Sequence, residues 1–75
     1  GSVGGTLPCV MNAANEVAVA AFLAEEGSYL GIAECVEATM SAHERAGVQK
    51  VESLEQLIEI DAWARKYGRA NVIPL

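Results

Sequence analysis

The feature that most constrains the fold is the run from Asn12 to Leu23, whose two halves differ in character. From Val17 onward it contains only valine, alanine, phenylalanine and leucine, so a helix formed there is apolar on every side. A helix without a polar face has to be covered by other segments. We therefore expect this run to be the central helix of a small bundle, not a surface helix of a free-standing small protein.

The first half of the same run is polar at helical spacing. Asn12, Asn15 and Glu16 stand at positions i, i+3 and i+4, which places them together on one helix surface. Asparagine is unfavourable inside a helix because its side chain competes for backbone groups. We predict that these three side chains form a junction with another segment.

The first helix is expected to begin after Thr6, a good N-cap, with Pro8 in its first turn. It should continue to about Ala24. Gly27 is expected to supply the left-handed residue that ends it. Small alanines allow close approach of other helices, and Phe22 is expected to supply bulk to the core together with Leu23.

A second helix is predicted from about Ile32 to Gly47. Its apolar stripe comprises Ile32, Val36, Thr39 or Met40, and His43, with Cys35 beside it. A third helix begins at a capping box made by Ser53 and Gln56, and it should stop at Gly68 or Asn71. Its expected buried residues are Leu54, Leu57, Ile58, Ile60, Trp63, Ala64 and Tyr67. No strand pattern is seen, so the fold class is all-α, a small helical bundle of three main helices.

The charge excludes several function classes. The 75 residues carry a formal net charge of -5, which argues against nucleic acid and against an anionic membrane surface as partners. No apolar run reaches the roughly 18 residues of a membrane span, and no signal peptide is visible. Cys9 and Cys35 lie far apart, so a disulfide is possible, but reduced thiols are the favoured prediction. Residues 1–5 are interpreted as a tag scar and linker, and residues 6–75 as the domain.

The ionisable residues give no strong catalytic motif. His43, the only histidine, is expected to be a surface or half-buried residue near a helix C-terminus. Asp61 falls on the apolar stripe of the third helix and has Arg65 at i+4. We hypothesise that Asp61, paired with Arg65, is a buried polar anchor. We predict no catalytic, cofactor-binding or metal-binding residue in this chain.

Two stretches carry a resemblance to a known family. The first is Gly5-Thr6-Leu7-Pro8 continuing through Asn12-Ala13-Ala14-Asn15-Glu16 to Leu23, and the second is Ser53-Leu54-Glu55-Gln56 continuing into Asp61-Ala62-Trp63-Ala64-Arg65. Both resemble the C-terminal domain of 1-deoxy-D-xylulose 5-phosphate reductoisomerase. Ile32 and Val36 stand where the middle helix of that family has apolar residues.

The resemblance implies a parent enzyme that converts 1-deoxy-D-xylulose 5-phosphate to 2-C-methyl-D-erythritol 4-phosphate in non-mevalonate isoprenoid biosynthesis. It implies NADPH and a divalent cation, Mg or Mn, bound by other domains, and a homodimeric parent in the bacterial cytoplasm or a plastid-type organelle. For this chain it implies a left-handed superhelical end domain that packs on the rest of the enzyme and is inactive alone. We also expect the separated domain to self-associate through an exposed apolar face.

Two other functions are left open by the residues. One is a free-standing helical protein-interaction module. The other is an acyl-carrier-like protein modified on Ser53, suggested by Glu52-Ser53-Leu54 at a helix start. The capping box explains Ser53 without any modification.

Overall fold

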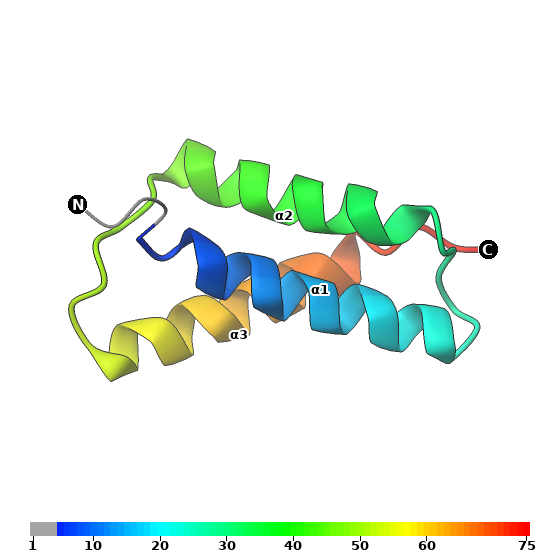
Figure 1. Cartoon of the computed structure of the whole chain (residues 1–75), viewed down its shortest axis with the longest axis horizontal. Coiled ribbons are helices and arrows are strands. Elements are labelled where there is room, and N and C mark those ends of the chain that lie inside the picture. The colour runs from blue at the N-terminus through cyan, green and yellow to red at the C-terminus, as the bar shows by residue number, and fades with distance from the viewer. Residues whose placement is uncertain (1–4) are drawn as a thin grey trace.

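The computed structural model describes residues 5–75, which form three α-helices joined by short loops (Figure 1). These are α1 (Leu7–Leu23), α2 (Gly31–Ala46) and α3 (Leu54–Ala70). α2 runs antiparallel to α1, and α3 returns in the direction of α1 (Figure 1). This part of the chain contains no strand, so the predicted all-α class is confirmed. The left-handed superhelix stays a prediction.

α1 is the central helix, as predicted. Both other helices pack along it and touch each other far less. The core cluster lies in the N-terminal half of α1, where Val10 and Ala13 are fully buried against Ala64 of α3. Met40 of α2 and Ile60 of α3 pack on this cluster. The small side chains of α1 allow both neighbours to approach closely, which is why the core forms there.

The most apolar end of α1 is not part of this core, which corrects the expectation for Phe22 and Leu23. Leu23 is 73% exposed, and Phe22 is half-buried with its ring centroid 5.5 Å from that of Tyr29. Figure 1 shows that α3 ends before α1 does along the long axis of the molecule, so only α2 and the C-terminal tail accompany the last turn of α1.

The prediction that Gly27 supplies the left-handed residue at the end of α1 is also wrong. Glu25 has the positive φ of 62°, and the amides of Glu25 and Glu26 bond to the carbonyls of Phe22 and Ala21. This is the Schellman pattern, with a glutamate where glycine is usual. Gly27 has another role, because a Cβ there would lie 2.9 Å from a methyl of Val72.

The remaining helix ends follow the prediction closely. α2 is ended by Gly47, whose φ is 110°. At the start of α3, the amide of Gln56 donates to Ser53 Oγ over 3.1 Å, and Gln56 Oε1 accepts from the amide of Glu52 over 2.7 Å. Asn71 caps the end of α3.

The buried face of α3 differs from the predicted stripe. Leu54 is 72% and Ile58 59% exposed, whereas Ala64 and Gly68 are buried. Gly68 faces Ala14, since a Cβ at position 68 would lie 3.7 Å from the Cα of that residue. Small residues therefore form the closest part of the contact with α1, with Ile60 packed beside them, whereas Leu54 and Ile58 are turned away from it.

Candidate functional site

The outer face of α1, the side covered by neither neighbour, carries the predicted junction residues. Asn12, Asn15 and Glu16 are all exposed. Among residues 5–75, neither asparagine side chain forms a hydrogen bond within the chain. The structure thus leaves two amides free to bond to something else, and the junction role stays a prediction. We call this surface the amide ridge.

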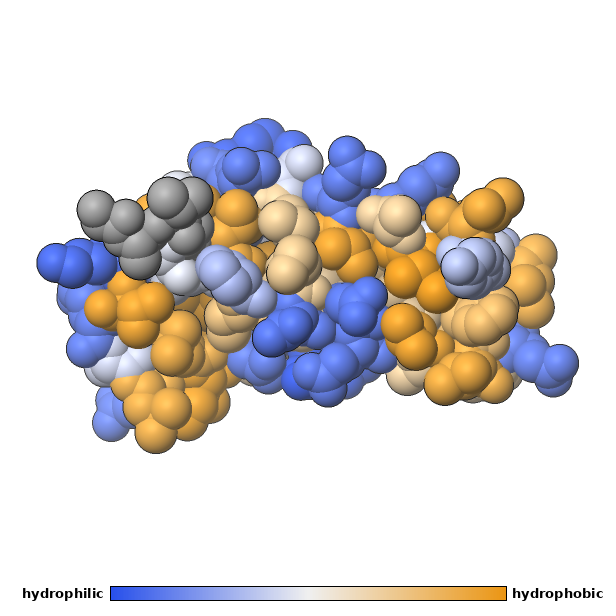
Figure 2. All heavy atoms as spheres, in the orientation of Figure 1, coloured by the Kyte–Doolittle hydropathy of each residue, from blue (hydrophilic) through white to orange (hydrophobic). Residues whose placement is uncertain are grey.

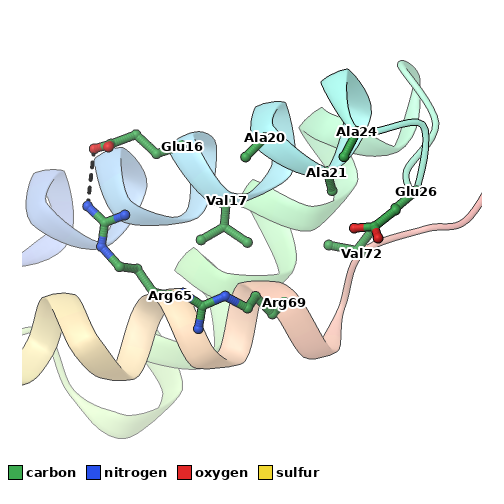
Figure 3. A pocket seen from close by; sticks show the side chains of 9 residues that line it. All are labelled: Glu16, Val17, Ala20, Ala21, Ala24, Glu26, Arg65, Arg69 and Val72. Atoms are coloured by element: carbon green, nitrogen blue, oxygen red, sulfur yellow. Dashed lines mark hydrogen bonds and ion pairs between the residues drawn. The ribbon is translucent and has the colours of Figure 1, made fainter.

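Glu16 differs from the two asparagines because it has a partner within the chain. Nη2 of Arg65 donates to Glu16 Oε2 over 3.3 Å (Figure 3). Nε of the same arginine donates to Asp61 Oδ2 over 2.8 Å. The hydrogen bond to Asp61, followed by the charge of that carboxylate, raises the pKa of Arg65. The predicted Asp61–Arg65 pair is present, and it ties α3 to α1 through Glu16.

The hypothesis that Asp61 is buried is wrong, because its side chain is 39% exposed. α3 turns its smallest residues toward α1, so the position of Asp61 falls at the edge of the contact and remains open to water. A helical i,i+4 pair that is partly open to water stabilises a helix by only about 0.2–0.5 kcal/mol. Whether the pair acts as an anchor stays a prediction.

A groove of about 690 Å³ lies between α1 and α3 beside this ion network (Figure 3). Its floor is formed by small apolar residues of α1, and its rim carries two arginines and two glutamates. The lining residues are Glu16, Val17, Ala20, Ala21, Ala24, Glu26, Arg65, Arg69 and Val72. Chemically the groove suits an apolar segment with polar flanks.

A second groove, of about 500 Å³, lies between α1 and α2. Asn12 and Asn15 line it together with Met11, Ile32, Ala33, Val36 and Glu37. The predicted polar patch is therefore divided, with the two amides on the α2 side of the ridge and Glu16 on the α3 side.

Exposed apolar side chains lie mainly toward the two ends of the molecule. Figure 2 shows hydrophobic residues gathered at both ends of the visible face and hydrophilic residues between them. The larger exposed apolar residues are Met11, Leu23, Tyr29, Leu30, Val48, Val51, Leu54, Ile58, Trp63 and Leu75. The sequence periodicity missed this arrangement, because it assigned Leu54 and Ile58 to the core.

The histidine is buried, which corrects the expectation of a surface or half-buried residue. His43 is 5% exposed, and its Nε2 lies 2.7 Å from Oγ1 of Thr6. Thr6 precedes α1 as predicted, but its hydroxyl makes no capping bond to the helix. Helical spacing cannot reveal this pairing, because the two residues are far apart in the sequence.

The thiols are free, as favoured from the sequence. Cys35 is buried and its Sγ donates to the carbonyl oxygen of Gly68 over 3.2 Å, whereas Cys9 is half-buried. Burial raises the pKa of both thiols, and the nearby Asp61 charge adds to the effect on Cys9. Neither thiol therefore has the lowered pKa of a catalytic nucleophile.

The described residues contain no group of three metal-ligating side chains. No helix in this part of the chain is long and apolar enough to cross a membrane. Ser53 Oγ is engaged in the cap of α3, as the capping box predicts.

Comparison with known proteins identifies the family. The model of the DXP reductoisomerase C-terminal domain matches residues 1–67. The chain belongs to this family. The reductoisomerase of Chlorobium chlorochromatii is 55% identical over 62 residues, which are 83% of this chain and 15% of the relative. Those of Ruminiclostridium cellulolyticum and Bacillus subtilis are 45% and 46% identical over 71 and 67 residues, which are 95% and 89% of this chain.

The chain spans 18% of the length of the Ruminiclostridium relative and 17% of that of the Bacillus relative. No solved structure matches it. The family expected from the two sequence stretches is confirmed, and the DXP reductoisomerase domain described here corresponds to only a small part of those relatives.

Proposed function

We propose that residues 6–75 are the C-terminal structural domain of a 1-deoxy-D-xylulose 5-phosphate reductoisomerase. The interpretation of residues 1–5 as a tag scar and linker stays a prediction without support from the family match, which begins at residue 1, and residues 1–4 lie outside the described part. The observation that carries the proposal is the family match over residues 1–67, together with relatives that bear the name of this enzyme. The parent enzyme reduces and isomerises its substrate with NADPH and a divalent cation, in the bacterial cytoplasm or a plastid-type organelle, as a homodimer.

The chemistry of the parent belongs to its other domains on this proposal. A divalent cation needs several oxygen or nitrogen ligands that converge, and residues 5–75 bring no such group together. The residues present do not fit the metal, so we assign it and NADPH to domains outside this chain. The role of this domain is to support the enzyme body, and alone it is inactive.

The amide ridge of α1 is the surface we assign to the contact with the enzyme body. It offers free side-chain donors and acceptors at Asn12 and Asn15, and it lies between two grooves with apolar walls. Apolar surface around a few unsatisfied polar groups is typical of a contact that a partner completes.

A chimera tests the proposal. This chain replaces the matching region of the Bacillus subtilis relative, and NADPH oxidation is followed with substrate and Mg or Mn. We expect no turnover from this chain alone, none from the truncated relative, and turnover from the chimera. Turnover by the chain alone, or an inactive chimera that is folded, would contradict the proposal.

The ridge is tested in the same chimera by replacing Asn12 and Asn15 with lysine. Two buried charges in a contact should lower kcat/KM at least about tenfold, which corresponds to about 1.4 kcal/mol. The melting temperature of the isolated chain should not fall, because both side chains are exposed there and lysine is a better helix former than asparagine. Ala62→Lys is the matched control, since Ala62 is exposed on α3 and lines neither groove. If Ala62→Lys lowered kcat/KM as much as the lysine changes at Asn12 and Asn15, the amide ridge would not be the contact surface.

We also propose that the isolated chain self-associates. Leu23, Leu30, Leu54 and Leu75 are each more than 70% exposed, which is unusual for large apolar side chains that cluster at the ends of a small protein. Sedimentation should give a weight-average mass that rises with concentration. A monomer at every concentration would speak against it.

A further inference from the structure

A buried polar cluster joins three segments at the end of the bundle where α1 begins. Thr6 is fully buried and His43 nearly so. Oγ1 of Thr6 lies 2.7 Å from Nε2 of His43 in the last turn of α2. The backbone amide of Gln49, in the loop after α2, donates to the same Oγ1 over 3.0 Å, and the amide of Thr6 donates to the carbonyl of Gln49 over 2.9 Å. Thr6 therefore holds Gln49 through its backbone and its side chain.

Donor counting assigns the proton on the histidine. The Thr6 hydroxyl accepts from Gln49, and its single hydrogen needs an acceptor because the residue is fully buried. Nε2 of His43 is the acceptor at hand, and with Nε2 accepting, the ring proton lies on Nδ1. The opposite tautomer would bury the hydroxyl hydrogen without a partner.

Two neighbours extend the cluster. Nε2 of Gln56 in α3 donates to Oε1 of Gln49 over 2.8 Å, so the first turn of α3 is tied to the same residue. On the other side, Gly5 has a φ of 39°, and a Cβ at this position would collide with the carbonyl oxygen of Gln49. The backbone that leads into Thr6 thus lies directly against Gln49, which only glycine permits.

The position of Thr6 sharpens the interpretation. A threonine before a helix ordinarily uses its hydroxyl to cap a free amide of the first turn, which contributes about 1 kcal/mol. Thr6 makes no such bond. Its hydroxyl is committed to segments 37 and 43 residues away in the sequence. The chain has given up a local cap in favour of a long-range connection.

We propose that Thr6, His43 and Gln49 form a clamp that fixes the backbone at Gly5 and Thr6, where the described chain enters α1. This inference rests on the proposed function, in which the clamp orients the domain against the enzyme body. Thr6 and His43 are then positioning residues.

The clamp is tested first on the isolated chain by nuclear magnetic resonance at neutral pH. The ¹⁵N shifts of His43 should show a protonated Nδ1 and an unprotonated Nε2 that accepts a hydrogen bond. Thr6→Val should accelerate amide exchange of Gln49 at least about tenfold relative to Ala18 in the core of α1, and lower the heteronuclear NOE of Gly5. Thr6→Ser should restore both values.

Thr39→Val is the matched control. Thr39 is also fully buried in α2, but its hydroxyl donates only to the carbonyl of Cys35 within the same helix, over 2.8 Å. Thr39→Val should leave the amide exchange rate of Gln49 unchanged relative to that of Ala18. A proton on Nε2 of His43 in the unmodified chain would overturn the clamp, and so would a uniform acceleration of all amides by Thr6→Val.

The orienting role is tested in the chimera with the Bacillus subtilis relative. Thr6→Val should lower turnover at least about threefold, Thr6→Ser should restore it, and Thr39→Val should leave it unchanged. Equal turnover with Thr6→Val would refute the orienting role. A chimera that is inactive even with the unmodified chain would contradict the proposed function, while the resonance experiments would still decide on the clamp.

Discussion

Replacing Gly68 with alanine should stabilise this protein, although Gly68 is buried. The residue lies inside α3, where glycine costs about 0.5–1 kcal/mol relative to alanine because it loses more backbone freedom on folding. A Cβ built at position 68 would lie 3.7 Å from Ala14 Cα and 3.7 Å from Val17 Cγ1, which are ordinary contact distances. The methyl group therefore fits without displacing α1, and the expected gain is about 0.5–1 kcal/mol.

The assay is thermal unfolding followed by circular dichroism. In a domain of this size 1 kcal/mol shifts the melting temperature by about 4–8 °C, so Gly68→Ala should raise it by about 2–8 °C. Gly31→Ala is the matched control, because a Cβ there would lie 2.6 Å from Ser28 Oγ and 2.8 Å from Ile73 Cβ. That crowding should lower the melting temperature. A lower melting temperature for Gly68→Ala, or shifts of the same sign in both variants, would refute the reasoning.

The structure leads to four further predictions. Glu25→Gly should raise the free energy of unfolding by about 0.5–1 kcal/mol in urea, because a left-handed conformation costs an L-residue about 1–2 kcal/mol and glycine recovers most of it. Glu26→Gly should give no gain in the free energy of unfolding, because Glu26 lacks the positive φ. Iodoacetamide should modify the half-buried Cys9 at least about tenfold faster than the buried Cys35, and equal rates would mean that Cys35 is accessible. Because burial raises the thiol pKa of Cys35 in the folded chain, the unfolded chain loses that proton first, so stability should decline above about pH 8.5 and Cys35→Ala should weaken this decline. Replacing both Asn12 and Asn15 with alanine should raise the unfolding free energy of the isolated chain by about 1 kcal/mol, and a loss of stability would show that the amides bond within the chain.

The helices could be predicted because their signals are local. Gly47 and the Ser53–Gln56 box act within one turn of the helix ends that they mark, and the Asp61–Arg65 pair lies within one helix. The central place of α1 could also be predicted, because a segment without a polar side has to be covered.

The contacts between helices could not be predicted in the same way. Arg65 meets Glu16 across 49 positions of sequence, and nothing in the spacing of either helix indicates that they face each other. The exposure of Leu54 and Ile58 could not be predicted for the same reason, because it depends on which face of α3 contacts α1. Periodicity finds the most apolar stripe of a helix, whereas the contact between α1 and α3 follows its smallest side chains, Ala64 and Gly68.

The amides of α1 connect the stability of this chain with its proposed role. Two exposed asparagines inside a helix cost about 1 kcal/mol relative to alanine, and no hydrogen bond among residues 5–75 offsets that cost at Asn12 or Asn15. The opposite side of the same helix is filled with small, well-packed residues, so the sequence of α1 is optimised for its own bundle on one side only. The isolated chain does not offset this free-energy cost. A partner that covers the two amides and satisfies their donors and acceptors would offset it. The change to alanine at both positions should therefore have opposite signs in the two settings, stabilising the isolated chain and lowering the turnover of the chimera. The same sign in both would mean that the amide ridge is an unfavourable surface without a partner.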